Sequence, residues 1–195
     1  GIFKRALEKL IKKNSNILVE SNCDVENLDL PSRINRNRVV LQSKEKTLSC
    51  DLLLAADGRF SKTRFHAEVK YFYHDYKQSA YVFNIRHEKS HQSTALERFF
   101  PTGPLAILPM KSSKNKQSSV VWTVDNIHGD LLKLSPNQFL NEFNKRYDNF
   151  FGKIQHMSNP VKFNLNIFSC YEFHNNKIVL VGDACQAIHP IAGQG

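Results

Sequence analysis

Two stretches of the sequence place Asp and Gly directly after an apolar run, an arrangement in which a strand delivers polar groups to a ligand. The first reads DLLLAADGRFSKTR, and Asp57 and Gly58 follow its apolar run. Ligands of open α/β sheets bind outside the carboxyl ends of the strands. Gly58 permits a positive φ and a close backbone approach, while Asp57 can accept hydrogen bonds from sugar hydroxyls or from its own loop. An ordinary Asp-Gly turn explains the same residues, so both interpretations stay open.

The second stretch, IVLVGDACQAIHPIAGQG, closes the sequence and is richer in turn-forming and polar residues. Asp183, preceded by Gly182, stands at the expected strand end, where its carboxylate can bind a ribose or another hydroxylated chain. Pro190 stiffens the loop, and Gly193 and Gly195 let backbone amides lie against a flat ring or an anion. A plain turn does not need this density of Gly, Pro and Asp. The second stretch therefore predicts a ligand-binding loop.

Apolar spacing indicates the elements that carry these two stretches. Residues 2–12 place apolar side chains at helical intervals, with Lys and Glu on the other face, and predict an amphipathic helix. Short strands are expected next at Ile17–Glu20, Asp24–Leu30, Arg38–Gln42 and Thr47–Leu54, the last two joined as a hairpin by a polar turn at Ser43–Lys46. The second arm continues into Leu52–Ala56, which is apolar enough for a fully buried strand.

From Tyr71 onward the pattern is typical of an antiparallel sheet with one helix. The expected strands are Gln78–Arg86, Ala95–Phe100, Ala106–Met110, Ser119–Val124 and Val161–Phe168. Between them, Ser135 followed by Pro136 and by Gln138 forms the pattern of a capping box and predicts a helix start. Lys177–Gly182 is one more buried strand, and it leads into the second stretch.

Composition places the chain among globular proteins. Hydrophobic residues make up 41% and charged residues 23% of the 195 positions, and no apolar run reaches the about 20 residues of a membrane span. The net charge of +9 includes two basic clusters, at 33–38 and 111–116, in loop-like sequence. Solvated loops explain both clusters, and contact with anionic lipid is the alternative. We expect no nucleic-acid partner, and a cytoplasmic protein that contacts the inner membrane peripherally at most.

Other residue types that could do chemistry fit structural roles better. The string from His87 to His91 has the spacing of a zinc-protease motif, but it lies in polar sequence after a strand, so no metal site is expected. The four cysteines form no CxxC pair and are expected to be reduced thiols: Cys23, Cys50, Cys170 and Cys185. His189 is interpreted as part of a loop rather than as a base. The aromatic residues between Tyr71 and Phe83 are expected in the sheet core or in a substrate pocket.

The first stretch resembles a signature of the flavin-dependent aromatic-ring hydroxylases, the family with the fold of para-hydroxybenzoate hydroxylase. Asp57-Gly58 is similar to the DG motif of that family. The resemblance implies that this loop, with Arg64, serves the pyrophosphate of FAD and the nicotinamide cofactor. The catalytic residues of the reaction are not identified by it.

The second stretch is similar to the GD motif of the same family. The resemblance implies that Gly182-Asp183 meets the ribityl chain of FAD, and that Pro190 and the run Gly193, Gln194 and Gly195 border the isoalloxazine. The sequence departs from the family at Cys185-Gln186, where the family usually has Ala-His. A polar contact near the cofactor is therefore expected to differ.

Two segments are similar to the ubiquinone-biosynthesis hydroxylases within this family: HPIAGQG at the end of the sequence and ERFFPTGPLAILP from Glu97 to Pro109. That resemblance implies an oxidoreductase that uses FAD, NAD(P)H and O₂ to hydroxylate a polyprenylated phenol, with other ubiquinone-biosynthesis proteins as further partners. The GxGxxG loop of the family is not found, the sequence does not begin with Met, and the family continues beyond Gly195. We therefore expect a fragment that is inactive by itself.

The resemblance implies an α/β fold with an α+β substrate domain, in which discontinuous Rossmann-like FAD-binding pieces enclose an antiparallel sheet. The expected FAD-binding pieces are residues 1–66 and 170–195, and the expected antiparallel-sheet substrate domain is residues 67–169. Two alternatives remain open. One is another flavoenzyme of this fold, such as a geranylgeranyl reductase or a halogenase, and the other is a non-catalytic remnant or scaffold subunit.

Overall fold

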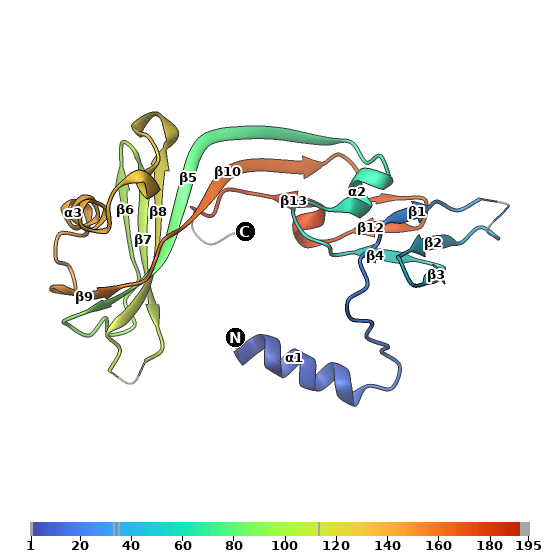
Figure 1. Cartoon of the computed structure of the whole chain (residues 1–195), viewed down its shortest axis with the longest axis horizontal. Helices are drawn as coiled ribbons and strands as arrows, with labels where there is room; N and C mark the ends of the chain where they lie inside the picture. Colours follow the sequence, from blue (N-terminus) through green and yellow to red (C-terminus); the bar gives the residue numbers. More distant parts are fainter. Residues whose placement is uncertain (1, 33, 35, 113, 192–195) are drawn as a thin grey trace. The chain divides into compact units, whose positions relative to one another are not determined.

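A computed structural model describes residues 2–32, 34, 36–112 and 114–191. The chain divides into two compact units, coloured along the sequence in Figure 1. The first unit comprises the chain up to Val69 together with Glu172–Ala184, and the second unit comprises Lys70–Tyr171 together with the segment that starts at Cys185. The division therefore falls inside the second stretch singled out above, between Ala184 and Cys185.

The N-terminal part of the first unit holds the predicted helix and hairpin. Helix α1 spans Ile2–Lys13 and keeps its apolar face exposed. Strands β1 (Asn27–Asp29), β2 (Val39–Gln42) and β3 (Thr47–Cys50) form an antiparallel sheet in the order β1-β2-β3. The hairpin is confirmed, but the strand predicted at Ile17–Glu20 is wrong, since these residues are exposed and outside any strand. Apolar residues form a strand only where a neighbouring strand completes their backbone hydrogen bonds.

A second small sheet of the first unit carries the two Asp-Gly stretches. It has the order β11-β12-β4, with β11 at His174–Asn175, β12 at Ile178–Leu180 and β4 at Leu53–Ala55. The expected arm Thr47–Leu54 ends at Cys50, and β4 starts anew after Asp51 and Leu52. The fully buried strand is also a correction, because Leu54 is 61% exposed while Ala55 is buried. Side chains alternate between the two faces of a strand, so only one face of β4 is covered.

The second unit is built on a larger antiparallel sheet of order β13-β10-β5-β8-β7-β6. Its longest strand, β5, spans Tyr71–His87 and pairs with both β8 and β10. The remaining bounds are β6 Leu96–Phe100, β7 Gly103–Met110, β8 Gln117–Asp125, β9 Ile154–Met157, β10 Val161–Cys170 and β13 Gln186–Ala187. Strand β9 pairs with β5 beside this path. The antiparallel sheet predicted from Tyr71 onward is confirmed.

Helix α3 (Pro136–Tyr147) packs on this sheet and closes its core (Figure 1). The predicted capping box is present, with the Ser135 side chain accepting from the Gln138 amide and the Gln138 side chain accepting from the Ser135 amide. Phe143 of the helix meets Phe83 edge to face at 5.0 Å between ring centroids. Such aromatic pairs add about 0.5–1.5 kcal/mol beyond the area they bury. The hydrophobic core of the second unit therefore lies between α3 and the sheet.

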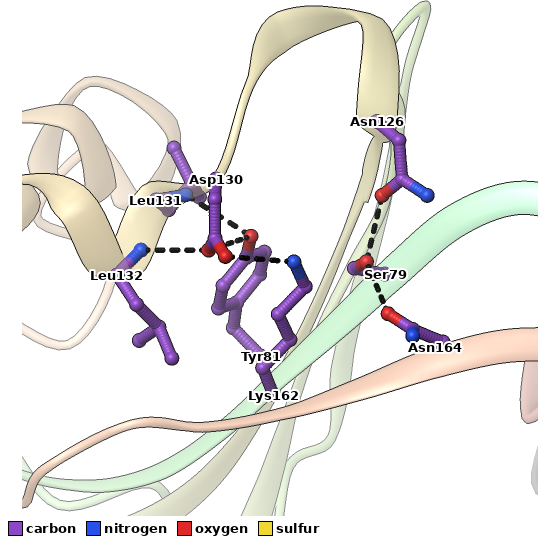
Figure 2. Close-up of polar contacts among 8 residues, drawn as sticks. All are labelled: Ser79, Tyr81, Asn126, Asp130, Leu131, Leu132, Lys162 and Asn164. Atoms are coloured by element: carbon purple, nitrogen blue, oxygen red, sulfur yellow. Dashed lines mark hydrogen bonds and ion pairs between the residues drawn. The ribbon is translucent and has the colours of Figure 1, made fainter.

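A polar network ties the loop before α3 to the sheet (Figure 2). The loop contains η1 (Asn126–His128) and η2 (Leu131–Lys133). The buried Tyr81 of β5 donates to Asp130 Oδ1 at 2.9 Å and accepts from the Leu131 amide, and Lys162 of β10 donates to Asp130 Oδ2 at 2.8 Å. The hydrogen bond from Lys162 lowers the pKa of Asp130 to about 2, and burial raises the pKa of Tyr81 to about 12. Asp130 is thus held ionised.

Among the residues that the structure describes, no helix combines the length and the apolar character needed to cross a membrane.

Candidate functional site

The two Asp-Gly stretches meet at one edge of the small sheet of the first unit. Strands β4 and β12 are parallel neighbours, with Leu53 opposite Ile178 and Ala55 opposite Leu180. The Val181 amide extends the pairing by donating to the Ala55 carbonyl at 2.9 Å. Because both strands run the same way, the residues that follow their carboxyl ends emerge at the same edge. The pairing places the loop after Ala55 beside the loop after Leu180.

In the first of these loops, Asp57 organises the backbone that follows it. Its Oδ2 accepts from the Thr63 amide at 3.1 Å. Partial burial opposes its ionisation, but hydrogen bonds from Ser61 and Thr63 outweigh this and hold the pKa of the carboxyl below its ordinary value. Ser61 in turn caps helix α2 (Lys62–His66) by accepting from the Arg64 amide at 2.9 Å. Asp57 is therefore an ionised group that shapes the loop.

Each of the two loops contains a glycine with a positive φ, a conformation that residues with a side chain rarely adopt. Gly58 has a φ of +79° and Gly182 a φ of +58°, and a Cβ added to either would meet no atom within 4 Å. A side chain at either position would therefore cost backbone strain rather than a clash. The space beside both backbones is open, which is what a close ligand approach requires.

Arg64 joins the two loops. It is 9% exposed, and its guanidinium donates to the Ala184 carbonyl at 2.7 Å and to the Arg59 carbonyl at 2.8 Å. A planar guanidinium holds several donors in a fixed geometry, and hydrogen bonds from a charged donor are the stronger kind. Arg64, which the sequence predicted to bind a cofactor, thus uses these donors to bind backbone carbonyls of the two loops. Asp183, next to Ala184 in the 3₁₀ turn η3 (Gly182–Ala184), keeps its side chain exposed.

The continuation of the second stretch lines a hollow of the second unit. The hollow has a volume of about 260 Å³, and its lining is formed by His189, Pro190 and Ile191 together with Glu97, Pro104, Ala106, Leu108, Val121 and Thr123. The described part of the lining is mainly apolar and contains one carboxylate, one hydroxyl and one imidazole. Ligand sites commonly combine an apolar wall with a few polar groups that set orientation.

His189 stabilises the loop that borders this hollow. The Ile191 amide donates to His189 Nδ1 at 3.2 Å, so Nδ1 carries no proton, and Nε2 faces the amide oxygen of Gln78 at 3.2 Å. Burial lowers the pKa of the imidazole, in agreement with the neutral ring that these contacts require. The ring also packs edge to face on Tyr76 at 5.2 Å. Both nitrogens of His189 are therefore occupied in holding residues 189–191.

The structure describes only some of the predicted site residues. Gly193, Gln194 and Gly195 lie outside the described residues. Pro190 is described, and it lines the hollow of the second unit. Sequence reasoning missed Glu97 and Thr123 as lining residues. The alternation of Pro104, Ala106 and Leu108, which puts their side chains on one face of β7, was the available signal.

The zinc-protease-like string has a structural explanation. His87 is buried, contacts the Lys89 carbonyl at 2.6 Å and Ser118 Oγ at 3.0 Å, and stacks on Phe151. His91 contacts the Met110 carbonyl at 3.1 Å. Burial lowers the pKa of His87, which favours a neutral ring. These two histidines therefore stabilise the loop after β5.

Of the aromatic residues expected in the sheet core or in a substrate pocket, Tyr81 and Phe83 belong to the core.

Comparison with known proteins relates this geometry to a family. The profile of the family described as "FAD binding domain" matches residues 19–195. Ubiquinone hydroxylase UbiL of Rhodospirillum rubrum is 36% identical over 155 residues, which cover 78% of this chain and 35% of that protein. The mitochondrial ubiquinone biosynthesis monooxygenase COQ6 of Drosophila melanogaster is 26% identical over 225 residues, covering 97% of this chain and 46% of that protein. The chain thus spans less than half the length of these relatives.

Solved structures show the same fold at low sequence identity. The p-nitrophenol 4-monooxygenase PnpA from Pseudomonas putida DLL-E4 superposes with a TM-score of 0.74 at 16% identity, covering 97% of this chain and 48% of that one. The flavin-dependent halogenase CmlS gives a TM-score of 0.72 at 18% identity, covering 97% of this chain and 35% of that one. At these identities the likeness concerns the fold alone.

Proposed function

This chain belongs to the FAD-binding domain family, and from that premise we propose that the protein is an FAD-dependent monooxygenase that hydroxylates the ring of a polyprenylated phenol in ubiquinone biosynthesis. NAD(P)H is the proposed electron donor. The bound flavin would supply the activated oxygen, while the protein binds and orients both cofactor and phenol.

The observation that carries the proposal is the parallel pairing of β4 with β12, which puts two Asp-Gly loops at one sheet edge. FAD fits these loops, because the backbone beside Gly58 and Gly182 is open and the carboxylate of Asp183 is exposed. Asp183 would accept hydrogen bonds from the hydroxylated chain of FAD. Asp57 and Arg64 would act as positioning residues, since both bind the backbone of the loops.

The second stretch continues into residues that we propose to border the flavin ring. They are Pro190, Gly193, Gln194 and Gly195. Pro190 is held in place by the contacts of its neighbour His189 with Ile191 and Gln78. A glycine residue has no side chain, which lets backbone amides face a flat ring.

The hollow of the second unit is the proposed place for the phenol ring. Its walls, formed by alternate residues of β7 and β8, are mainly apolar, and among the described residues that line it Glu97 supplies the one carboxylate. A phenol hydroxyl is a hydrogen-bond donor, and a carboxylate is the stronger kind of acceptor for it. We assign Glu97 the role of orienting the phenol. His189 serves the loop and not the reaction.

A basic hollow where β5 ends and β8 begins supports peripheral contact with a membrane surface. It has a volume of about 430 Å³ and is lined by Arg86, Lys114 and Lys116 together with Ser112, Gln117 and Gln155. Among the described residues, no carboxylate contributes to this lining. Cationic side chains near anionic lipid each add about 1 kcal/mol of attraction. Co-sedimentation of the full protein with phosphatidylglycerol vesicles but not with phosphatidylcholine vesicles is the expected result, and equal sedimentation with both would contradict it.

The reaction is tested with the full-length protein, FAD, NAD(P)H, O₂ and a short-chain prenylphenol. The expected product is the phenol with one added oxygen atom, detected by mass spectrometry and dependent on the reduced cofactor. Inclusion of chloride and bromide tests the halogenase alternative, which predicts a halogenated ring. A protein that retains FAD but converts the phenol to neither product would instead favour a reductase or a scaffold subunit.

A further inference from the structure

Two cysteines of the second unit stand opposite each other at the end of an antiparallel pair. Strands β10 and β13 pair Phe168 with Ala187 and Ser169 with Gln186. One further step places Cys170 opposite Cys185, and the Cys170 amide donates to the Cys185 carbonyl at 3.0 Å. The register and this hydrogen bond together define the Cys170–Cys185 pair as a hydrogen-bonded pair of the ladder.

The Cα spacing of such a pair lies within the range that disulfides accept. Hydrogen-bonded pairs in antiparallel sheets have Cα atoms about 5.5 Å apart, and directly opposite side chains point to the same face with Cβ atoms about 4.5–5.5 Å apart. Disulfides accept Cα separations of about 4.4–6.8 Å, with Cβ atoms slightly closer than in an unlinked pair. In a disulfide the Cβ atoms lie about 3.5–4.5 Å apart, so the two strand ends must also approach each other by up to about 1 Å while the thiols rotate toward one another.

We propose that Cys170 and Cys185 form a disulfide when the protein meets hydrogen peroxide. The two thiols and one peroxide molecule give one disulfide and two water molecules, so the O–O bond breaks, the S–S bond forms and both sulfurs are oxidised. The first sulfur is converted to a sulfenic acid, which the second sulfur then attacks with loss of water. The two residues are 4% and 7% exposed, so a small oxidant is required. A dithiol reductant reverses the reaction.

The place of the pair gives the disulfide a structural effect. The chain leaves the second unit after Tyr171 and returns to it at Cys185, and the segment in between carries β12 and Gly182-Asp183. A bond between Cys170 and Cys185 would close this segment into a covalent loop. The bond would stabilise it mainly by restricting its unfolded states. The disulfide involves these two thiols only and does not depend on the reaction that the protein catalyses.

The test uses the purified full-length protein with its cofactor. It is treated with a small excess of hydrogen peroxide, quenched with catalase, unfolded in iodoacetamide and digested without reduction. Mass spectrometry is expected to find a peptide that links Cys170 to Cys185 and has lost two hydrogen atoms, and dithiothreitol is expected to remove it. Slower proteolysis within residues 172–184 is expected in the oxidised protein.

Two comparisons sharpen the result. Cys185→Ala should remove the linked peptide, and this variant is suited to the position because the hydroxylases that the sequence resembles usually have Ala there. Cys23 and Cys50 are half-buried thiols of the first unit, and Cys50 lies opposite Val39, so a link between them is not expected. Full alkylation of Cys170 and Cys185 after a tenfold excess of peroxide would overturn the proposal, as would their oxidation to sulfinic acids without a link.

Discussion

The guanidinium of Arg64 lies 2.7 Å from the carbonyl oxygen of Ala184, which is 120 positions later in the chain. A second bond from the same group reaches the Arg59 carbonyl at 2.8 Å. The buried charge thus connects the loop after β4 with the loop after β12. It holds in register the two segments that carry Asp57 and Asp183.

Replacing Arg64 is expected to lower stability and flavin retention together. Arg64→Ala leaves the buried Ala184 carbonyl and the partly buried Arg59 carbonyl without their charged donor, which should reduce the free energy of unfolding by roughly 2–4 kcal/mol. Arg64→Lys should lose less stability, because an ammonium can replace one of the bonds but not the planar fork. Urea unfolding of the full protein measures the stability of both variants, with the exposed Arg5→Ala as the control. The visible flavin absorption after desalting measures flavin retention. Equal stability of Arg64→Ala and the parent would contradict the linking role.

Asp183 is expected to decide whether FAD stays bound. Asp183→Ala removes the exposed carboxylate that we assign to the hydroxylated chain of FAD, and the desalted protein should lose its visible flavin absorption. Asp51→Ala is a matched control, because Asp51 is also an exposed carboxylate of the first unit and forms an ion pair with Arg38. Unchanged FAD occupancy in Asp183→Ala, with normal folding by circular dichroism, would remove Asp183 from the site.

Glu97 is expected to affect turnover and not the cofactor. Glu97→Gln replaces a charged acceptor by a neutral one, so kcat/KM for the prenylphenol should fall about tenfold or more, in line with loss of a charge-assisted hydrogen bond. FAD absorption should stay as in the parent. The exposed Glu172→Gln serves as the control. A normal kcat/KM in Glu97→Gln would assign the phenol to another position.

Gly103 is expected to be sensitive to any side chain. It has a φ of +128°, and an added Cβ would lie 2.6 Å from the Thr123 carbonyl oxygen, so the strands β7 and β8 would have to separate. Gly103→Ala should cost roughly 2–4 kcal/mol of unfolding free energy. Gly129→Ala is the matched control, since its φ is also positive at +84° but its Cβ would meet nothing within 4 Å. Gly129→Ala should cost about 1 kcal/mol of unfolding free energy. Equal losses of unfolding free energy in the two variants would show that the contact between the added Cβ and the Thr123 carbonyl is unimportant.

Asp130 is expected to make the second unit sensitive to acid. Its pKa is lowered to about 2, chiefly by the hydrogen bond from Lys162, whereas an aspartate in an unfolded chain has a pKa of about 3.9. Because the folded pKa is the lower one, the stability from this group is complete above about pH 4 and is lost as pH falls toward 2. Lys162→Met should raise the pKa of Asp130, as followed by carboxyl NMR. An unchanged pKa would exclude Lys162 as the main cause.

Local patterns predicted much of the second unit. The capping box at Ser135 and the alternation along β7 and β8 depend on neighbours in sequence, and both are present in the structure. Ile17–Glu20 shows the limit of this reasoning. Its composition favours a strand, but a strand needs a partner for its backbone, and composition contains no information on partners.

The sequence by itself determined that each of the two loops carries a carboxylate next to a glycine, which can adopt the positive φ found at Gly58 and Gly182, because both features depend on residue type alone. Only the tertiary structure decided that these loops share one sheet edge, that Arg64 binds both, and that Glu97 and His189 line one hollow. These relationships join residues far apart in the chain. They arise from strand pairing and burial, which depend on the whole fold and not on any one segment.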